Sequence, residues 1–325
     1  MVRNSLLRRR QLMLGVGSGL VLGPLMSARA NTYPTRPVEL VVPAAAGGGS
    51  DALARAFAES LKKHFPQPLL VSNKPGASGS IGMTEVLNSR PDGYKVAMVV
   101  TELVILPHLG TIKFTHADFA LVALLNADPA AITVKADAKW NTVEEFLADA
   151  RSKPTQIKTG NSGNGSIWHV AAVGLEEKAN VSFTHVPFQG AAPAVLALMG
   201  GHIDAVTVSP AEVAANVRAG RLKMLGVMSD QRVSGWERVP TLKERNIDLS
   251  IAAWRGLGVP KDTPVSVVDS LREATRKAAE DPAFREALVK ANLGYAYLDA
   301  PDFNNSIRSQ NELFRLIVRK LDMKS

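Results

Sequence analysis

The sequence predicts an α/β protein of two domains, each with a mainly parallel sheet flanked by helices. Short apolar runs alternate along the chain with segments whose apolar residues recur at helical spacing, which is the alternation of strands and helices in α/β proteins. Three of the predicted strand-to-helix junctions are rich in glycine. A length of 325 residues is also more than one simple core requires.

The first predicted unit runs from residue 38 to residue 61. Residues 38–42 form an apolar run that is typical of a strand covered on both faces, and Pro43 ends it. Residues 44–49 carry almost no side chain, so a ligand could lie against main-chain N–H groups there. Ser50 and Asp51 are candidate N-caps of the helix that follows, whose apolar stripe consists of Leu53, Phe57 and Leu61.

Two further units repeat this order of strand, glycine loop and helix. One has a strand at 68–72, a loop at 73–82 and a helix at 83–88. The other has a strand at 156–159, a loop at 160–166 and a helix at 167–178.

The other elements follow from the same apolar patterns. Strands are predicted at 94–100, at 131–134 after the segment 114–125, and at 183–188, 203–208, 222–227 and 254–259. Helices are predicted at 143–151, 191–199, 211–219, 263–279, 282–291 and 301–321, with a short one from residue 240. Thr142 and Glu145 form a candidate capping box at the first of these helices.

The first thirty residues have the pattern of an export signal. Arg8, Arg9 and Arg10 precede an apolar run that ends near Met26, and Ala28-Arg29-Ala30 fits a signal cleavage site. The same arginines fit either a twin-arginine or an ordinary Sec signal. No cysteine follows for lipid attachment, and no later segment has the ~20 apolar residues of a membrane helix. We therefore expect a soluble protein of the periplasm with residues 1–30 removed.

The charge of the chain comes largely from this signal. Removing residues 1–30 takes away five arginines and no acid, so the formal charge falls from +8 to +3. No later cluster of Lys and Arg is interleaved with aromatic residues, and we expect no nucleic-acid partner. The chain has no cysteine, which excludes disulfides and thiolate chemistry.

The three glycine loops predict an anion site. Tight turns in any α/β protein also need glycine, but each of these loops opens a helix, and together they are rich in Gly, Ser and Asn. Uncapped N–H groups and the positive end of a helix dipole attract an anion. None of the loops has a nucleotide-binding motif.

A catalytic interpretation of the third loop is the main alternative. Ser162 or Ser166 could act with His169 as nucleophile and base in a secreted α/β hydrolase. No G-x-S-x-G elbow surrounds either serine, which favours Ser166 as a helix cap and His169 as a packing residue. The histidines lack metal-binding spacing, so no metal or other cofactor is expected.

Two acids and two tryptophans have both structural and functional interpretations. Asp51 could cap a helix and Asp204 could pair with a turn, or both could face a ligand. Trp168 and Trp254 fit a core better than a ligand platform.

Motifs spread over nearly the whole mature chain resemble one family. They are VELVVP, AAAGGGSDALAR, NKPGASGSIG, RPDGY, GNSGNGSIWH, THVPFQG, GGHID, AGRLKMLGV and VPTLKE, in this order. They resemble the periplasmic solute-binding receptors of tripartite tricarboxylate transporters, the TctC or Bug receptors. GNSGNGSIWH and ELVILPHLG are closer to the tricarboxylate-type receptors than to the amino-acid or nicotinate binders.

The resemblance implies a two-lobed Venus flytrap fold of the periplasmic binding proteins, in which two crossovers join the lobes. The first lobe would comprise residues 31–128 and 252–325, and the second residues 129–251. The family holds a ligand carboxylate between glycine loops through N–H groups, hydroxyls and water, largely without an arginine.

Carried onto this sequence, the resemblance implies a set of ligand-binding residues. They are Ala46, Gly47, Gly48, Asp51, Ser78, Gly79, Gly163, Asn164, Gly165, Ser166, Gln189, Gly190 and Asp204. Thr101, at the end of a predicted strand, is a further candidate for ligand binding. The sequence departs from the family pattern at Ala44, where an aromatic residue often stands, and at Phe188, which replaces a frequent tyrosine.

These features together predict a receptor and no enzyme. We expect a monomer that captures a small organic carboxylate of the di- or tricarboxylate type between its lobes. Its partners would be the membrane permease subunits of a tripartite tricarboxylate transporter, or a sensor protein if the receptor serves signalling.

Overall fold

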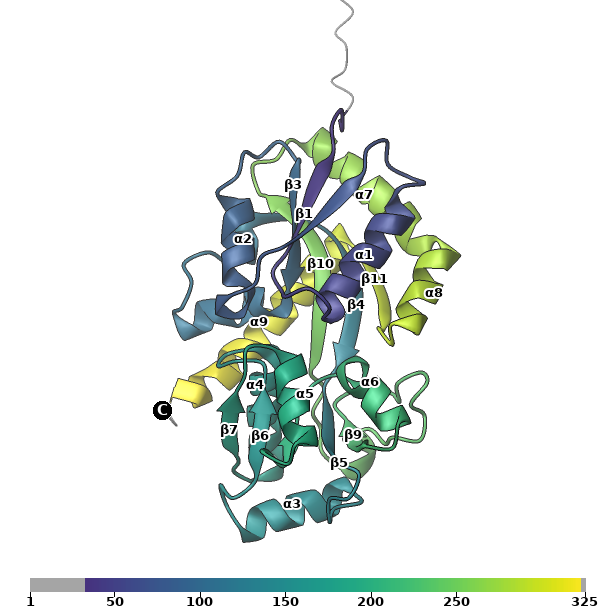
Figure 1. Cartoon of the computed structure of the whole chain (residues 1–325). Helices are drawn as coiled ribbons and strands as arrows, with labels where there is room; N and C mark the ends of the chain where they lie inside the picture. Colours follow the sequence, from purple (N-terminus) through teal and green to yellow (C-terminus); the bar gives the residue numbers. More distant parts are fainter. Residues whose placement is uncertain (1–32, 323–325) are drawn as a thin grey trace, which may run out of the picture. The chain divides into compact units, whose positions relative to one another are not determined.

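The structure is a computed structural model that describes residues 33–322 (Figure 1). From Tyr33 onward the chain forms one compact unit with two sheets. The predicted export signal lies outside the described residues. None of the described helices is long and apolar enough to cross a membrane.

The larger sheet has six strands in the order β11-β4-β10-β3-β1-β2. Their bounds are β1 Val38–Val42, β2 Leu69–Asn73, β3 Lys95–Val100, β4 Phe119–Pro129, β10 Ala252–Pro260 and β11 Tyr295–Asp299. β1 pairs in parallel with β2 and β3, whereas β10 and β11 pair antiparallel with their neighbours. We call this sheet and its helices the first lobe.

The smaller sheet has five strands in the order β7-β6-β8-β5-β9. Their bounds are β5 Ala131–Lys135, β6 Lys158–Asn161, β7 Thr184–Pro187, β8 Ala205–Val206 and β9 Leu222–Val227. β6 pairs in parallel with β7 and β8, and β5 pairs antiparallel with β8 and β9. This sheet and its helices form the second lobe.

Both sheets are therefore mixed, although the sequence predicted mainly parallel ones. The α/β class and the two lobes are confirmed. Parallel pairing is found within the units of strand, glycine loop and helix, because the helix returns the chain to the end of the sheet at which the previous strand began. Antiparallel pairing appears where the chain passes from one sheet to the other.

Helices cover the sheets. In the first lobe they are α1 Gly49–Leu61, α2 Ser80–Leu87, α7 Val265–Glu280, α8 Pro282–Lys290 and α9 Ala300–Asp322. In the second lobe they are α3 Val143–Ser152, α4 Ile167–Ala179, α5 Ala191–Met199 and α6 Pro210–Arg218. Short 3₁₀ helices occupy Ala77–Gly79, Thr101–Val104, Leu106–Leu109, His116–Asp118 and Lys243–Arg245.

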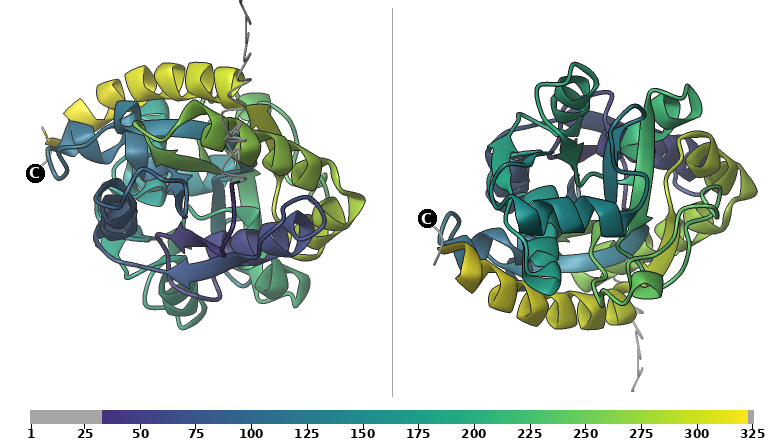
Figure 2. Two further views of the ribbon diagram at one scale, coloured as in Figure 1. Left: turned by 90° about the horizontal axis from the view of Figure 1, so that it is seen from above. Right: turned by 90° about the horizontal axis from the view of Figure 1, so that it is seen from below.

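The helices of the first lobe lie on two sides of its sheet. Figure 2 shows α9 on one side and α1 on the other. α1 packs with α7 and α8, and the rings of Phe57 and Phe284 meet edge to face, with their centroids 6.0 Å apart. On the other side, Phe303 of α9 packs edge to face on Trp254 of β10. α9 also packs against α4 of the second lobe.

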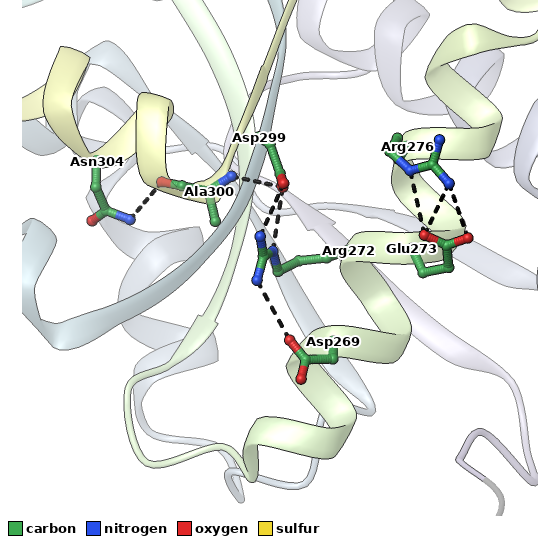
Figure 3. Close-up of polar contacts among 7 residues, drawn as sticks. All are labelled: Asp269, Arg272, Glu273, Arg276, Asp299, Ala300 and Asn304. Carbon is green, nitrogen blue, oxygen red and sulfur yellow. Dashed lines mark hydrogen bonds and ion pairs between the residues drawn. The ribbon is translucent and has the colours of Figure 1, made fainter.

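A polar cluster fixes the start of α9 against α7 (Figure 3). Arg272 donates to the Asp299 carboxylate through Nη2 at 2.9 Å and Nε at 3.2 Å. The same carboxylate accepts the N–H of Ala300 at 2.8 Å, at the first residue of α9. The hydrogen bonds from Arg272 hold the pKa of Asp299 below its usual value, in spite of partial burial. The cluster thereby anchors the long C-terminal helix.

The structure corrects several predicted details. α1 begins at Gly49 with Gly48 at its N-cap, so Ser50 and Asp51 lie in the first turn and are not N-caps. Thr142 caps α3 as predicted, but Glu145 accepts the N–H of Asn141 and not that of Thr142. The sequence pattern also missed β11, an edge strand between two helices.

The chain changes sheets twice. It leaves the first lobe between β4 and β5 and returns after β9, where β10 begins at Ala252. We propose that the lobe boundaries fall at these two passages, near residues 128 and 252. As a result, loops from both lobes can approach one cavity.

Candidate functional site

A cavity of about 400 Å³ is lined by residues of both lobes. The first lobe contributes the loops that precede α1 and α2 and the facing ends of β3 and β10. The second lobe contributes the start of α4, α5 and α6. Predicted site residues that line it are Ala46, Gly47, Gly48, Ser78, Gly79, Thr101, Ser166, Gln189 and Gly190.

Asp51 shapes the first glycine loop through a hydrogen bond to its backbone. Its Oδ2 accepts the Gly47 N–H at 2.9 Å, and Arg55 pairs with its Oδ1, also at 2.9 Å. Burial raises the pKa of Asp51, but the hydrogen bonds from Arg55 and Gly47 outweigh it and keep the pKa below the usual value. Gly47 has a φ of +84°, which favours glycine. Asp51 was predicted to contact the ligand. In the structure it does not line the cavity but holds the loop that does.

The second loop places Ser78 between the lobes. Ala77 and Ser78 have positive φ angles of 44° and 51°, a conformation that is strained for residues with a side chain. The Ser78 hydroxyl donates to the Asn164 carbonyl of the third loop at 3.5 Å. The second and third glycine loops thus meet across the cavity.

The third loop lines the cavity through Ser162 and Ser166, next to the start of α4, whereas its glycines do not line it. Gly163, Asn164 and Gly165 do not line the cavity, contrary to the prediction. A Cβ on Gly165 would lie 2.4 Å from Leu109, so this glycine allows the loop to pack on the first lobe. The sequence motif identified the loop but could not show which of its residues turn toward the cavity.

Asp204 is placed away from the cavity. It precedes β8, which runs parallel to β6, so it lies at the opposite end of the sheet from the loop that follows β6. Its Oδ2 accepts the Lys158 N–H at 2.8 Å. The interpretation of Asp204 as a turn partner describes these contacts, and that of an acid facing the ligand is wrong in this structure.

Ser166 and His169 do not form a nucleophile and base. The Ser166 hydroxyl caps α4 by accepting the backbone N–H of His169 at 3.3 Å. The His169 ring accepts the Gly165 N–H through Nδ1 at 3.1 Å, and it does not line the cavity. Burial and the neighbouring His185 lower the pKa of His169 to about 4. The ring is a packed, neutral acceptor that supports the loop.

Three charged residues of the cavity were not predicted: Glu102, Glu212 and Arg255. Arg255 is a charged residue inside the apolar run of β10, and its side chain is only 7% exposed. Its Nη1 pairs with Asp128 at 2.7 Å and its Nε donates to Ser50 at 2.9 Å. One charge within a buried strand was the sequence signal that could have identified it.

The two glutamates approach the cavity from opposite lobes. Glu102 of the first lobe accepts the N–H of Ile167, the first residue of α4, at 3.2 Å. Burial raises the pKa of Glu102, and this hydrogen bond offsets part of the rise. Burial also raises the pKa of Glu212, which lies in the first turn of α6, and Arg255 offsets part of that rise.

The tryptophans line the cavity as well as the core. Trp168 and Trp254 are both buried, and both contribute to the cavity wall. The Thr101 hydroxyl accepts the backbone N–H of Trp254 at 2.7 Å, which fixes the end of β3 against β10, and the indole N–H of Trp254 donates to Gln310. Because both tryptophans line the cavity, a ligand bound there would change the surroundings of their indole rings.

Comparison with known proteins identifies relatives over most of the chain. A protein of Cupriavidus necator, the UPF0065 protein in gbd 5' region, is 31% identical over 297 residues, which cover 91% of this chain and 90% of that protein. The crystal structure of a TctC solute-binding protein from Polaromonas, without ligand, is 54% identical with a TM-score of 0.74, and it covers 89% of this chain and 100% of the other.

Two further comparisons concern the fold and the family. The periplasmic binding protein BugD is 28% identical with a TM-score of 0.81, over 89% of this chain and 98% of BugD. The family model for the tripartite tricarboxylate transporter family receptor, TctC, matches residues 53–323. This is a family of solute-binding receptors and not of enzymes. The chain therefore belongs to the TctC receptor family.

Proposed function

We propose that the protein is a periplasmic receptor that captures a small organic carboxylate in the cavity between its lobes. The observation that carries this proposal is the convergence of helix N-termini from both lobes on one cavity. The first turn of α1 lines the cavity from the first lobe, together with Gly79 at the N-cap of α2, and the first turns of α4, α5 and α6 line it from the second. The free N–H groups at the start of α1 and the dipoles of these helices favour an anion, whereas Glu102 and Ser166 already satisfy two N–H groups at the start of α4.

Free donors are available at the first glycine loop. The N–H groups of Gly48, Gly49 and Ser50 donate to none of the residues that the structure describes. A ligand carboxylate would satisfy them through charge-assisted hydrogen bonds, each worth roughly 1.5–3 kcal/mol. The hydroxyls of Ser78 and Ser162 and the amide of Gln189 add polar groups from both lobes.

The ligand class is a carboxylate of the di- or tricarboxylate type. Two solved proteins of the same fold support this class, Rpa4515 of Rhodopseudomonas palustris with adipate and MatC of the same organism with bound malate. Each is 24% identical to this chain, with TM-scores of 0.82 and 0.79. The cavity volume of about 400 Å³ suits a molecule of this size.

The partners that we propose follow from the family description, which names tripartite tricarboxylate transporters. After export and removal of residues 1–30, it would deliver its ligand to the membrane permease subunits of a tripartite tricarboxylate transporter. A receptor of this family that serves a sensor protein would bind its ligand in the same way, so the cavity does not distinguish these roles.

A thermal-shift screen of the mature chain against di- and tricarboxylates tests the proposal. At 100 times Kd, a ligand that binds only the folded state adds about 2.7 kcal/mol of stability. We expect at least one carboxylate to raise the melting temperature in a saturable manner, whereas its amide analogue does not. If no acid in the panel shifts the melting temperature, the carboxylate proposal is wrong.

A further inference from the structure

Glu212 is an unpaired acid in the cavity wall. It lies in the first turn of α6 in the second lobe. Its carboxylate makes no hydrogen bond or ion pair with any residue in the described part of the chain, 33–322. Glu102 differs, because its Oε1 already accepts the Ile167 N–H. Of the two acids, Glu212 is the one whose carboxylate is left for a ligand.

Arg255 lies beside Glu212 with one terminal nitrogen to spare. Its Nη1 is used by Asp128 and Asn126 and its Nε by Ser50. Its Nη2 donates to none of the residues that the structure describes. The guanidinium is therefore held through Nε and Nη1, and its Nη2 is free to donate to a ligand.

The open groups of Arg255 and Glu212 converge on the start of α1. A Cβ built on Gly49 would lie 3.2 Å from Arg255 Nη2 and 3.5 Å from Glu212 Oε1. Because Gly49 has no Cβ, both groups reach the end of the cavity where the free N–H groups of α1 lie. A donor and an acceptor of opposite charge thus stand next to the proposed carboxylate site.

An unsatisfied carboxylate in such a place requires a donor. A partly buried acid without a hydrogen bond loses the free energy of its hydration, and the positive charge of Arg255 favours its ionised form. The other charged group that acts on Glu212 is Asp128, which is itself paired with Arg255. A donor on the ligand would complete the set of contacts.

We propose that Glu212 accepts a hydrogen bond from a hydroxyl or ammonium group of the ligand while Arg255 and the first turn of α1 bind the neighbouring carboxylate. The preferred ligands are then carboxylates that carry a donor substituent, and Glu212 determines this preference. This inference rests on the proposed function and names the ligand class more closely.

Calorimetric titration of the mature protein with three four-carbon acids tests the inference. Succinate has no donor substituent, malate has a hydroxyl and aspartate has an ammonium group. A hydrogen bond to a charged group should make the dissociation constant of malate or aspartate roughly tenfold or more lower than that of succinate. Which of the two binds more tightly shows whether the donor is a hydroxyl or an ammonium group.

The variant Glu212→Gln has nearly the same shape and should reduce this preference to less than about threefold, because a neutral amide is a weaker acceptor. Glu102→Gln is the matched control, since it removes the same charge from the same cavity, and the preference should persist in it. Circular dichroism confirms folding, and Glu212→Asp provides a second variant, in which the shorter acid should weaken the preference only in part.

The outcomes separate the two proposals. Equal or tighter binding of succinate in the wild type would overturn the inference and leave the carboxylate receptor intact. The same holds if the preference survives Glu212→Gln, or if Glu102→Gln abolishes it equally. Absence of binding by every carboxylate in the thermal-shift panel would instead contradict the proposed function itself.

Discussion

The Asp128 carboxylate and the Arg255 guanidinium form a buried ion pair in the first lobe. Their side chains are 4% and 7% exposed, and the Nη1 to Oδ2 distance is 2.7 Å. Asp128 also accepts the Gly294 N–H through Oδ1 at 2.6 Å, which holds the chain ahead of β11. One acid therefore fixes both the guanidinium of the cavity and the start of the edge strand.

We expect Asp128→Ala to lower the free energy of unfolding by about 3–5 kcal/mol, because it leaves Arg255 as an uncompensated buried charge. Arg272→Ala is the control. It removes the more exposed pair with Asp299, whose side chains are 31% and 42% exposed, and we expect a smaller loss of about 1 kcal/mol. Urea denaturation of both variants measures the difference, and equal losses would contradict a special role for burial.

His169 should make stability depend on pH. Its pKa in the folded protein is about 4, below the value of 6.5 that it has when exposed. The unfolded chain therefore binds a proton at higher pH than the folded one does. Above pH 6.5 the ring is neutral in both states and the free energy of unfolding does not depend on its titration. As the pH falls from 6.5 toward 4, the free energy of unfolding decreases, because only the unfolded chain takes up the proton readily.

We expect the free energy of unfolding of His169→Gln to vary less with pH than that of the wild type between pH 6.5 and 4. Denaturation at half-unit steps of pH gives the difference between the two proteins and thereby removes the titration of the other acids. Parallel curves would show that His169 titrates normally in the folded state.

At the scale of single residues, local chemistry was predictable and distant contacts were not. The Ser166 cap followed from one residue and the helix after it. The environment of Arg255 depends on Asp128, which is far away in the sequence and on another strand. Asp204 had both a turn-partner and a ligand-facing interpretation in the sequence, and its position at the other end of the sheet follows from strand direction.

At the scale of elements, the glycine loops determine how closely a ligand can approach the helices. Gly48 has an extended backbone conformation that any residue adopts, with φ of −87° and ψ of 177°. A Cβ there would meet only the Ala45 carbonyl, at 3.7 Å. A larger residue is thus compatible with the fold but would fill the space in front of α1.

We expect Gly48→Val to abolish carboxylate binding, by more than about a hundredfold, while changing stability by less than about 1 kcal/mol. Lys74→Ala is the control, because Lys74 pairs with Glu85 and does not line the cavity. It should change affinity less than about tenfold. Calorimetry that showed the opposite pattern would mean that the Lys74 ammonium, and not the N–H groups of α1, holds the ligand.

Helices were more predictable than strands. α5, β1 and β9 have the predicted bounds, and the other helices start and end within a few residues of theirs. β8 is only two residues long and β11 is an edge strand that pairs antiparallel with β4. Both depend on neighbouring strands more than on their own apolar pattern, so the local sequence could not define them.

At the scale of the whole molecule, the cavity is completed only when both lobes contribute. Glu102 of the first lobe accepts a hydrogen bond from Ile167 of the second, and Ser78 donates to Asn164. The positions of the glycine loops in the sequence predicted that each lobe would supply part of the site. The pairs of contacting residues could not be predicted, because they depend on how the loops face one another.

A bound ligand should bring the two lobes together. The first lobe offers the N–H groups of α1 and the Nη2 of Arg255, whereas Glu212 and the starts of α4 and α5 belong to the second lobe, so only a closed conformation brings all of these groups to one ligand. A ligand should therefore favour the conformation in which both lobes contact it, which is a population shift through differential affinity. We expect a saturable change in tryptophan fluorescence, because Trp168 and Trp254 line the cavity from different lobes. Solution scattering should show a smaller radius of gyration with saturating ligand than without it. An unchanged scattering profile together with tight binding would indicate a preformed, rigid site, since a receptor that closes must become more compact.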